Sequence, residues 1–159
     1  MNLFPLDSDL TKCAEYTVDV HCIKQILESG QILSNCYPQD IALYKHTHTK
    51  HPMSLWLQES LSNFNWTIEY ALALGREYTF RYNKEHKSIK VVEYYRNFQP
   101  KIKDIGPTRM PRCFGEYKGI IPETDSVVED YRIYYKLAKS HLFSWKNRQV
   151  PSWLLNQNS

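Results

Sequence analysis

The sequence predicts an all-α protein, folded as one compact domain of five or six helices over residues 1–159. Apolar residues recur at three- and four-residue intervals along most of the chain, which is the spacing of one face of an α-helix. No segment alternates apolar and polar residues over the length of a strand. Hydrophobic residues make up 42% of the chain, enough for a core. No run approaches the roughly 18 apolar residues of a membrane-spanning helix. We therefore expect no membrane partner.

Two helices are expected in the first part of the chain. Ser8 or Asp9 can cap a short helix that ends near Tyr16, because a side-chain oxygen at this position accepts a free backbone N–H. Asp19 can cap a second, longer helix in the same way. Its apolar stripe is predicted to be Ile23, Ile26, Leu27 and Leu33. A proline-containing turn at residues 37–40 ends this helix.

The middle of the chain is also predicted to be helical. Pro52 suits the first turn of a helix, and the pattern from Met53 to about Asn83 indicates one broken helix or two consecutive helices. The core stripe of this region is expected to be Phe64, Ile68, Ala71, Leu72 and Gly75. Residues 88–98 predict a further helix. Its inward residues are predicted to be Ile89, Val92 and Tyr95.

A long irregular loop precedes the last helix. Residues 99–124 hold four Pro and three Gly, which interrupt regular structure, and loops of this length are usually functional. The pattern then predicts a helix over residues 125–141. The side of that helix predicted to pack inward carries Val128, Tyr131, Tyr135 and Ala138. A basic, aromatic tail follows from Trp145 to Trp153.

The composition limits the possible functions. The formal net charge of +3 permits a polyanionic partner, such as DNA or a nucleotide, without requiring one. Only 5 Gly are present, which argues against the common glycine-rich phosphate loops. The 4 Cys form no Cys-x-x-Cys pair and nothing signals secretion, so we expect reduced thiols and a cytoplasmic location.

Four polar residues share one side of the helix predicted to begin at Asp19. They are His21, Lys24, Glu28 and Gln31, spaced three and four residues apart. A row of side chains that can transfer protons is typical of the wall of a cleft. The alternative is a solvated helix face with one weak ion pair between Lys24 and Glu28.

A basic segment with three histidines leads up to Pro52. His46, His48 and His51 suggest zinc, but no His-Glu-x-x-His motif and no Cys pair supports a metal site, and we predict none. Phosphate fits better, because the first turn of the next helix offers free N–H groups and a partial positive charge. Lys50 and His51 are the expected phosphate ligands. A solvated loop is the other alternative.

Aromatic and cationic side chains gather in the region predicted as the long central helix. Trp56, Trp66 and Tyr78 could stack on bases, and Arg81 could pair with a phosphate. The structural alternatives are that both Trp side chains belong to the core and that Arg81 pairs with Glu77 four residues earlier.

A set of motifs runs through nearly the whole chain. It begins with His21-x-x-Lys24 and Ile26-Leu27-Glu28-Ser29-x-Gln31-Ile32-Leu33-Ser34. It continues with Thr49-Lys50-His51-Pro52, Trp56, Glu59-Ser60, Asn63, Trp66, Ala73-Leu74, Glu77-Tyr78-Thr79, Arg81-Tyr82 and His86-Lys87. It ends with Tyr131-Arg132-x-Tyr134-Tyr135, Trp145-Lys146 and Pro151-x-Trp153. Together these motifs resemble a largely uncharacterised helical family common in bacteriophage genomes. The resemblance implies a phage-encoded protein in the host-cell cytoplasm and names no activity.

A second resemblance covers roughly the first half of the chain. Lys50-His51-Pro52 stands near a helix start and follows a helix with Leu27-Glu28-x-x-Gln31. This arrangement is similar to the pyrimidine-dimer DNA glycosylase (endonuclease V) family, small all-α proteins of phage and bacteria. The family implies base excision, in which an N-terminal α-amine attacks the sugar C1′ and one Glu serves in proton transfer.

Carried over to this chain, the resemblance implies that Glu28 is the proton-transfer residue and that Lys50 and His51 touch DNA phosphate. The family's amine belongs to a small second residue that is exposed when Met is removed. Here Asn2 is bulky enough to keep Met1 in place, so the amine would be that of Met1. A terminal amine with a pKa of about 7.7–8.0 is partly neutral and able to attack.

The leading prediction is therefore a DNA glycosylase with abasic-site lyase activity. Its catalytic residues would be Glu28 and Met1, and no cofactor is expected. The alternative is a non-enzymatic phage protein that sequesters a cyclic or dinucleotide signal of host defence. It would use the predicted phosphate ligands His21, Lys24, Lys50, His51 and Arg81. A third possibility is a nucleotide-processing hydrolase built on the histidine cluster.

Overall fold

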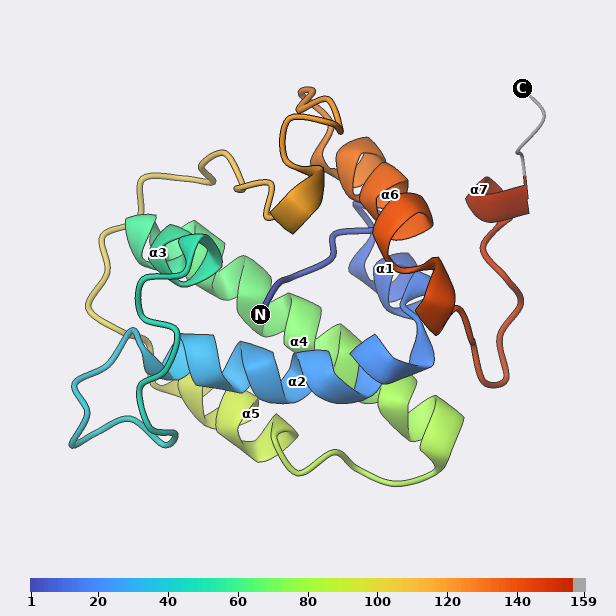
Figure 1. Ribbon diagram of the computed structural model, residues 1–159. Helices are drawn as coiled ribbons and strands as arrows, with labels where there is room; N and C mark the ends of the chain where they lie inside the picture. The colour runs from blue at the N-terminus through green and yellow to red at the C-terminus, as the bar shows by residue number, and fades with distance from the viewer. Residues whose placement is uncertain (156–159) are drawn as a thin grey trace.

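Two long helices organise the fold: α2 (Asp19–Ser34) packs across α4 (Leu61–Tyr82), as Figure 1 shows. The computed structural model describes residues 1–155. Within these residues the chain forms seven α-helices, six of them at least seven residues long, and no strand. The prediction of a compact all-α domain is confirmed.

The first helix, α1 (Leu10–Tyr16), begins as predicted, because the Asp9 side chain accepts hydrogen bonds from two backbone N–H groups of the first turn. The second helix begins differently. Val18 is the N-cap of α2, and Asp19 lies in its first turn. The Asp19 carboxylate instead accepts hydrogen bonds from Arg81 and from the backbone N–H of Lys146. The prediction that Asp19 caps this helix is therefore wrong.

The apolar stripe of α2 is narrower than its sequence suggests. Ile23 and Leu27 are each 41% exposed, so their prediction as core residues is wrong. The helix packs on α4 and on α5 (Ile89–Asn97) through the neighbouring face. The buried apolar residues on that face are Cys22, Ile26, Ile32 and Leu33.

The central region forms two consecutive helices, α3 (Pro52–Glu59) and α4, which is one of the two predicted arrangements. Ser60 separates them with an extended backbone, and its hydroxyl accepts a hydrogen bond from the backbone N–H of Ser62. Pro52 occupies the first turn of α3, as predicted. At Gly75 on α4, an added Cβ would lie 2.3 Å from Ile89 Cδ1, so glycine lets α5 pack closely.

Buried Arg112 fixes the long irregular segment ahead of α6 (Val127–Ala138). Its guanidinium donates hydrogen bonds to the Asp130 carboxylate on α6 and to the backbone carbonyls of Met110 and Thr124. This segment also contains the short 3-10 helix η1 (Gly115–Tyr117). A charge-assisted network therefore holds the residues on both sides of η1 against α6, and the Tyr117 hydroxyl of η1 donates to the carbonyl of Leu137 on α6.

The C-terminal tail returns across α1 and α4. It contains the 3-10 helix η2 (Ser140–Leu142) and the short helix α7 (Ser152–Leu155). The Trp145 indole N–H donates to the carbonyl of Tyr16, and Arg148 binds Glu77 on α4. No helix within residues 1–155 is long and apolar enough to cross a membrane.

Candidate functional site

A cleft with a volume of about 860 Å³ lies between α2, the start of α3, η1 and the C-terminal end of α6. We call it the central cleft. In Figure 1 the chain's N-terminus stands in the middle of these four elements. Met1, His21, Glu28 and His51 all line the cleft. Four residues singled out from three separate segments of the sequence therefore lie in one site.

Buried contacts hold the N-terminal segment so that Met1 reaches the cleft. Leu3 and Leu6 are fully buried and anchor the segment in the core. The Asn2 side chain donates to the carbonyl of Cys113 at 2.7 Å and accepts from the Tyr131 hydroxyl at 3.2 Å. Met1, in contrast, is only half-buried. The core fixes the segment without covering its first residue.

His51 ties Met1 to the start of α3. Its Nδ1 accepts a hydrogen bond from the backbone N–H of Met53 at 3.1 Å, which caps the helix. Burial lowers the pKa of His51, and so does the positive charge of the N-terminus, while a hydrogen bond to the Met1 backbone acts to raise it. The ring is therefore mainly neutral at pH 7, and it lies beside the first residue of the chain.

A chain of hydrogen bonds connects the N-terminal segment to Glu28. The backbone N–H of Phe4 donates to the Tyr70 hydroxyl at 3.2 Å, and that hydroxyl donates to Gln25 Oε1 at 3.4 Å. Gln25 Nε2 then donates to Glu28 Oε2 at 2.7 Å. Tyr70 and Gln25 are buried, whereas Glu28 is half-buried at the cleft. Glu28 and the segment that carries Met1 thus share one rigid support on α4.

His21 is an uncharged donor in the cleft wall. Burial, followed by the positive charges of Lys139 and Lys24, lowers its pKa from 6.5 to about 3. The Tyr135 hydroxyl oxygen accepts a hydrogen bond from the backbone N–H of Val18. The hydroxyl proton has one acceptor within reach among the described residues, His21 Nδ1 at 2.8 Å, so Tyr135 donates to that nitrogen. The neutral ring therefore carries its proton on Nε2. No partner for this N–H exists within residues 1–155, so it can bind a ligand acceptor.

The lowered pKa of His21 predicts acid sensitivity. An unfolded His binds a proton below about pH 6.5, but folded His21 does so only near pH 3. The free energy of unfolding should therefore fall by up to about 1.4 kcal/mol per pH unit below 6.5 on account of this residue. Urea unfolding at pH 7 and pH 4.5 measures the effect. In the His21→Gln variant the free energy of unfolding should decrease less between pH 7 and pH 4.5 than in wild type. In the His48→Gln variant, which changes an exposed loop residue, it should decrease as much as in wild type. An equal decrease for His21→Gln and wild type would contradict the lowered pKa of His21.

Three aromatic rings form the apolar floor of the cleft, and the sequence did not predict this role for any of them. Phe4 stacks on His21 with ring centroids 4.3 Å apart and on Tyr134 at 6.4 Å. Phe114 contacts Tyr134 at 4.9 Å, and all three rings line the cleft. Phe4 precedes the first helix of the chain, while Phe114 lies in the irregular segment before α6. No periodic pattern connects them.

Cys113 also lines the cleft, but it is not an activated nucleophile. Burial raises the pKa of its thiol, so the thiol stays protonated at neutral pH. Burial likewise raises the pKa values of the thiols of Cys13, Cys22 and Cys36. All four cysteines are free.

Arg81 does not reach the cleft, so its prediction as a phosphate ligand there is wrong. It is 2% exposed, and its guanidinium donates to Glu77 at 2.8 Å and to Asp19 at 3.0 Å. Its remaining N–H groups bind the carbonyls of Ala14 and Glu15 at the end of α1. The structural alternative, a pair with Glu77, is confirmed.

The three predicted base-stacking residues also lie elsewhere. Trp56 and Trp66 pack edge to face with centroids 5.8 Å apart and line a second pocket of about 460 Å³. Tyr78 packs between Tyr82 and His86 near the end of α4. None of the three lines the central cleft. The structure therefore places them away from Met1 and Glu28, and base stacking by these residues stays a prediction.

The histidine-rich segment divides into separate roles. His46 Nε2 hydrogen-bonds the carbonyl of Tyr37, His48 adopts a positive φ of 50°, and His51 caps α3. Lys50 is exposed and does not line the cleft. In the described part of the chain, no three His, Cys, Asp or Glu side chains are grouped to hold a metal ion.

Comparisons of the chain with protein-family models, curated proteins and solved structures find no match. The two family resemblances of the sequence motifs stay predictions. The chemistry of the central cleft is therefore what distinguishes the possible functions.

Proposed function

We propose that this protein is a DNA glycosylase with abasic-site lyase activity and that the central cleft is its active site. One observation carries the proposal. Met1, Glu28 and His51 come from three separate segments, yet they line the same cleft. A terminal amine and a carboxylate are the nucleophile and the proton-transfer group that amine-based excision of a base requires, and His51 lies beside the residue that carries the amine.

In the proposed reaction the amine of Met1 attacks C1′ of the damaged nucleotide. The bond from C1′ to the base breaks, and the base leaves with the bonding electrons and takes up a proton. Opening of the sugar then gives a Schiff base between C1′ and the amine. Removal of a C2′ proton expels the 3′ phosphate by β-elimination, and water hydrolyses the Schiff base to release the enzyme.

Glu28 is assigned the proton transfers, because a carboxylate can remove the C2′ proton and assist sugar opening. Its Oε2 is fixed by Gln25, so one oxygen is occupied and the other is available. His51 is assigned to holding the Met1 backbone against the start of α3. These assignments place the amine on the N-terminal segment and the proton-transfer carboxylate on α2, and the hydrogen bonds through Tyr70 and Gln25 connect the two elements.

The floor of the cleft suits a base that has left the stack. Phe4, Phe114 and Tyr134 offer apolar ring surface, and His21 offers one neutral N–H donor. Chemistry on a base requires such extrusion, because the sugar carbon cannot be reached within a stacked duplex. The pocket residues assigned here replace the Trp56, Trp66 and Tyr78 set expected from the sequence.

A second candidate function is sequestration of a small nucleotide. The cleft volume of about 860 Å³ is within the range of small-molecule sites, and this observation favours a di- or cyclic dinucleotide ligand. Such a binder would use the same cations and rings without needing Glu28 as a base.

The test is cleavage of oligonucleotide duplexes that contain one defined defect, either a cyclobutane pyrimidine dimer or an abasic site. We expect cleavage at the defect, with a 3′ end that carries the unsaturated aldehyde left by β-elimination. An undamaged duplex of the same sequence is the control and should stay intact. Tight binding of a dinucleotide with no cleavage of any duplex would favour sequestration instead.

A further inference from the structure

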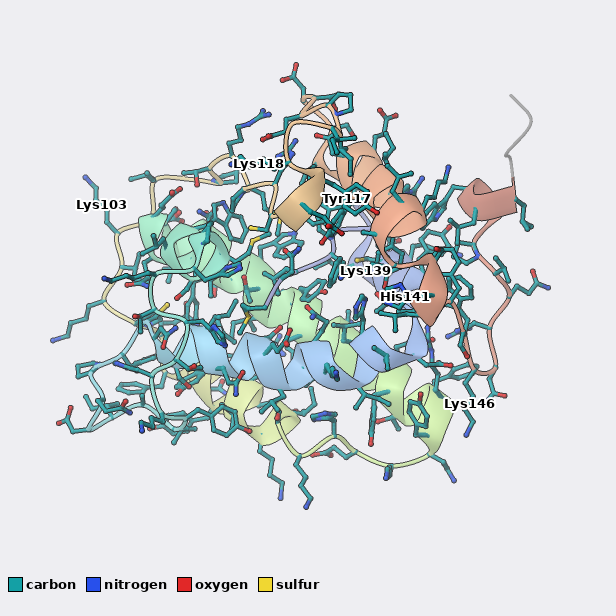
Figure 2. The ribbon with its side chains drawn as sticks, in the orientation of Figure 1. Lys103, Tyr117, Lys118, Lys139, His141 and Lys146 are labelled. Carbon is teal, nitrogen blue, oxygen red and sulfur yellow. The ribbon has the colours of Figure 1, made fainter. Side chains whose placement is uncertain are left out.

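Three lysines line the central cleft from separate elements. Lys24 lies on α2, Lys118 follows η1, and Lys139 is the C-cap residue of α6. Figure 2 shows Lys118 near η1 and Lys139 at the end of α6, on the side of the cleft opposite α2. We call these three residues the lysine rim. The cleft therefore presents cations on two facing walls.

None of the rim lysines forms an ion pair within residues 1–155. Arg112, which also lines the cleft, is neutralised by Asp130. Lys139 is half-buried, with Nζ 5.6 Å from the centre of the Tyr134 ring. Glu28 and Glu123 also line the cleft, but the three rim lysines and the N-terminal amine outnumber these two carboxylates, so the rim leaves the cleft with an excess of positive charge.

Two of the rim lysines and the N-terminal amine act on one side chain of the cleft, His21. Lys139, Lys24, His141 and the N-terminal amine all lower the pKa of His21, in that order after burial. Their separate elements are brought together only by the fold. A site that concentrates unpaired cations around a neutral N–H donor favours an anionic ligand with more than one charge.

We propose that the lysine rim binds backbone phosphates of a nucleic-acid strand, so that one nucleotide of a continuous strand lies between α2 and α6. This inference rests on the proposed function and names the residues that bind the phosphates of its substrate strand, none of which was predicted from sequence except Lys24. Cations on both walls match the phosphates on either side of one nucleotide. The strand enters past Lys118 and Lys139 and leaves past Lys24, with the base over Phe4 and Phe114.

The experiment measures the affinity for a duplex with a central tetrahydrofuran residue as a function of salt. This probe has neither a base nor an aldehyde, so binding is measured without cleavage. The logarithm of the binding constant falls linearly with the logarithm of the salt concentration. In the Lys118→Ala/Lys139→Ala variant this fall should be less steep by about two, close to one for each lost phosphate contact. Its affinity at low salt should fall by tenfold or more.

Two further variants sharpen the result. Lys118→Arg/Lys139→Arg keeps both charges and should restore the wild-type slope. Lys87→Ala/Lys90→Ala removes two exposed lysines at α5, on the far side of α2, and should leave the slope unchanged.

Unchanged affinity and slope in the Lys118→Ala/Lys139→Ala variant would overturn the proposal. It would also be overturned if that variant lost binding of deoxyadenosine monophosphate but bound the duplex normally, since the rim would then serve a small ligand. Failure of the proposed function is seen separately. It would appear as absence of cleavage of any duplex. Phosphate binding by the lysine rim would still be supported if the salt dependence of DNA binding were weaker in the Lys118→Ala/Lys139→Ala variant.

Discussion

Glu28→Gln should abolish most of the strand cleavage while leaving DNA affinity nearly intact. The substitution keeps the size of the side chain and its contact with Gln25, but it removes the group that accepts a proton. General acid–base residues contribute typically 10²–10⁴-fold in rate, so turnover should fall by about that factor. That factor equals a barrier increase of about 3–5 kcal/mol. Single-turnover cleavage of an abasic duplex and equilibrium binding of the tetrahydrofuran duplex measure the two quantities.

Glu93→Gln is the matched control, because it removes the same charge from an exposed position on α5. Its cleavage rate should equal that of wild type. A Glu28→Gln rate within about threefold of wild type would remove Glu28 from the chemistry. Equal losses of rate and affinity would show that Glu28 acts in binding and not in proton transfer.

The largest expected effect on stability is at Glu77, far from the cleft. This carboxylate is 5% exposed and accepts hydrogen bonds from Arg81 at 2.8 Å and from Arg148 at 2.9 and 3.0 Å. Glu77→Ala leaves buried Arg81 without its nearest counter-charge. Removing one partner of a buried pair costs about 3–5 kcal/mol of unfolding free energy, which lowers the melting temperature by roughly 10 °C.

Glu69→Ala on the same helix provides the comparison. Glu69 is half exposed, and its oxygen lies 3.9 Å from Arg96 Nε, so its removal should cost less than about 1 kcal/mol. Chemical unfolding of both variants gives the two free energies. A loss at Glu77 no larger than that at Glu69 would contradict the role of this network in holding α1 and the tail against α4.

The helices were predictable because their signals are local. Asp9 caps α1, Pro52 begins α3, and a three- to four-residue apolar spacing marks α4 and α6. The side of α2 that faces the core was not predictable to the residue. Ile23 and Leu27 fit the periodic pattern, and only the positions of α4 and α5 decide that they are exposed.

Part of the cleft was also predictable. His21, Lys24 and Glu28 share one helix face, so their common position follows from helix geometry. The sequence did not indicate that the same cleft is also lined by Lys118, Lys139 and Phe114. They come from a loop and a helix end that the buried Arg112–Asp130 pair holds in place.

Arg81 and Trp56 were expected from sequence to contact a ligand, but the structure places both outside the central cleft. Their chemistry suits phosphate and base recognition, but the fold uses it internally. Arg81 satisfies carbonyls at the end of α1, and the Trp56 indole N–H donates to the carbonyl of Thr108. The residue type alone cannot distinguish a buried structural partner from a ligand contact, because both need the same donors.

Borohydride trapping tests the central claim most directly. Reduction during reaction with an abasic duplex converts a Schiff base to a stable amine, which links the protein to DNA. Mass spectrometry of the digested adduct then identifies the modified residue. We predict that the sugar fragment is attached to the α-amine of Met1. Attachment to one of the cleft lysines, Lys24, Lys118 or Lys139, or absence of any adduct would contradict the account.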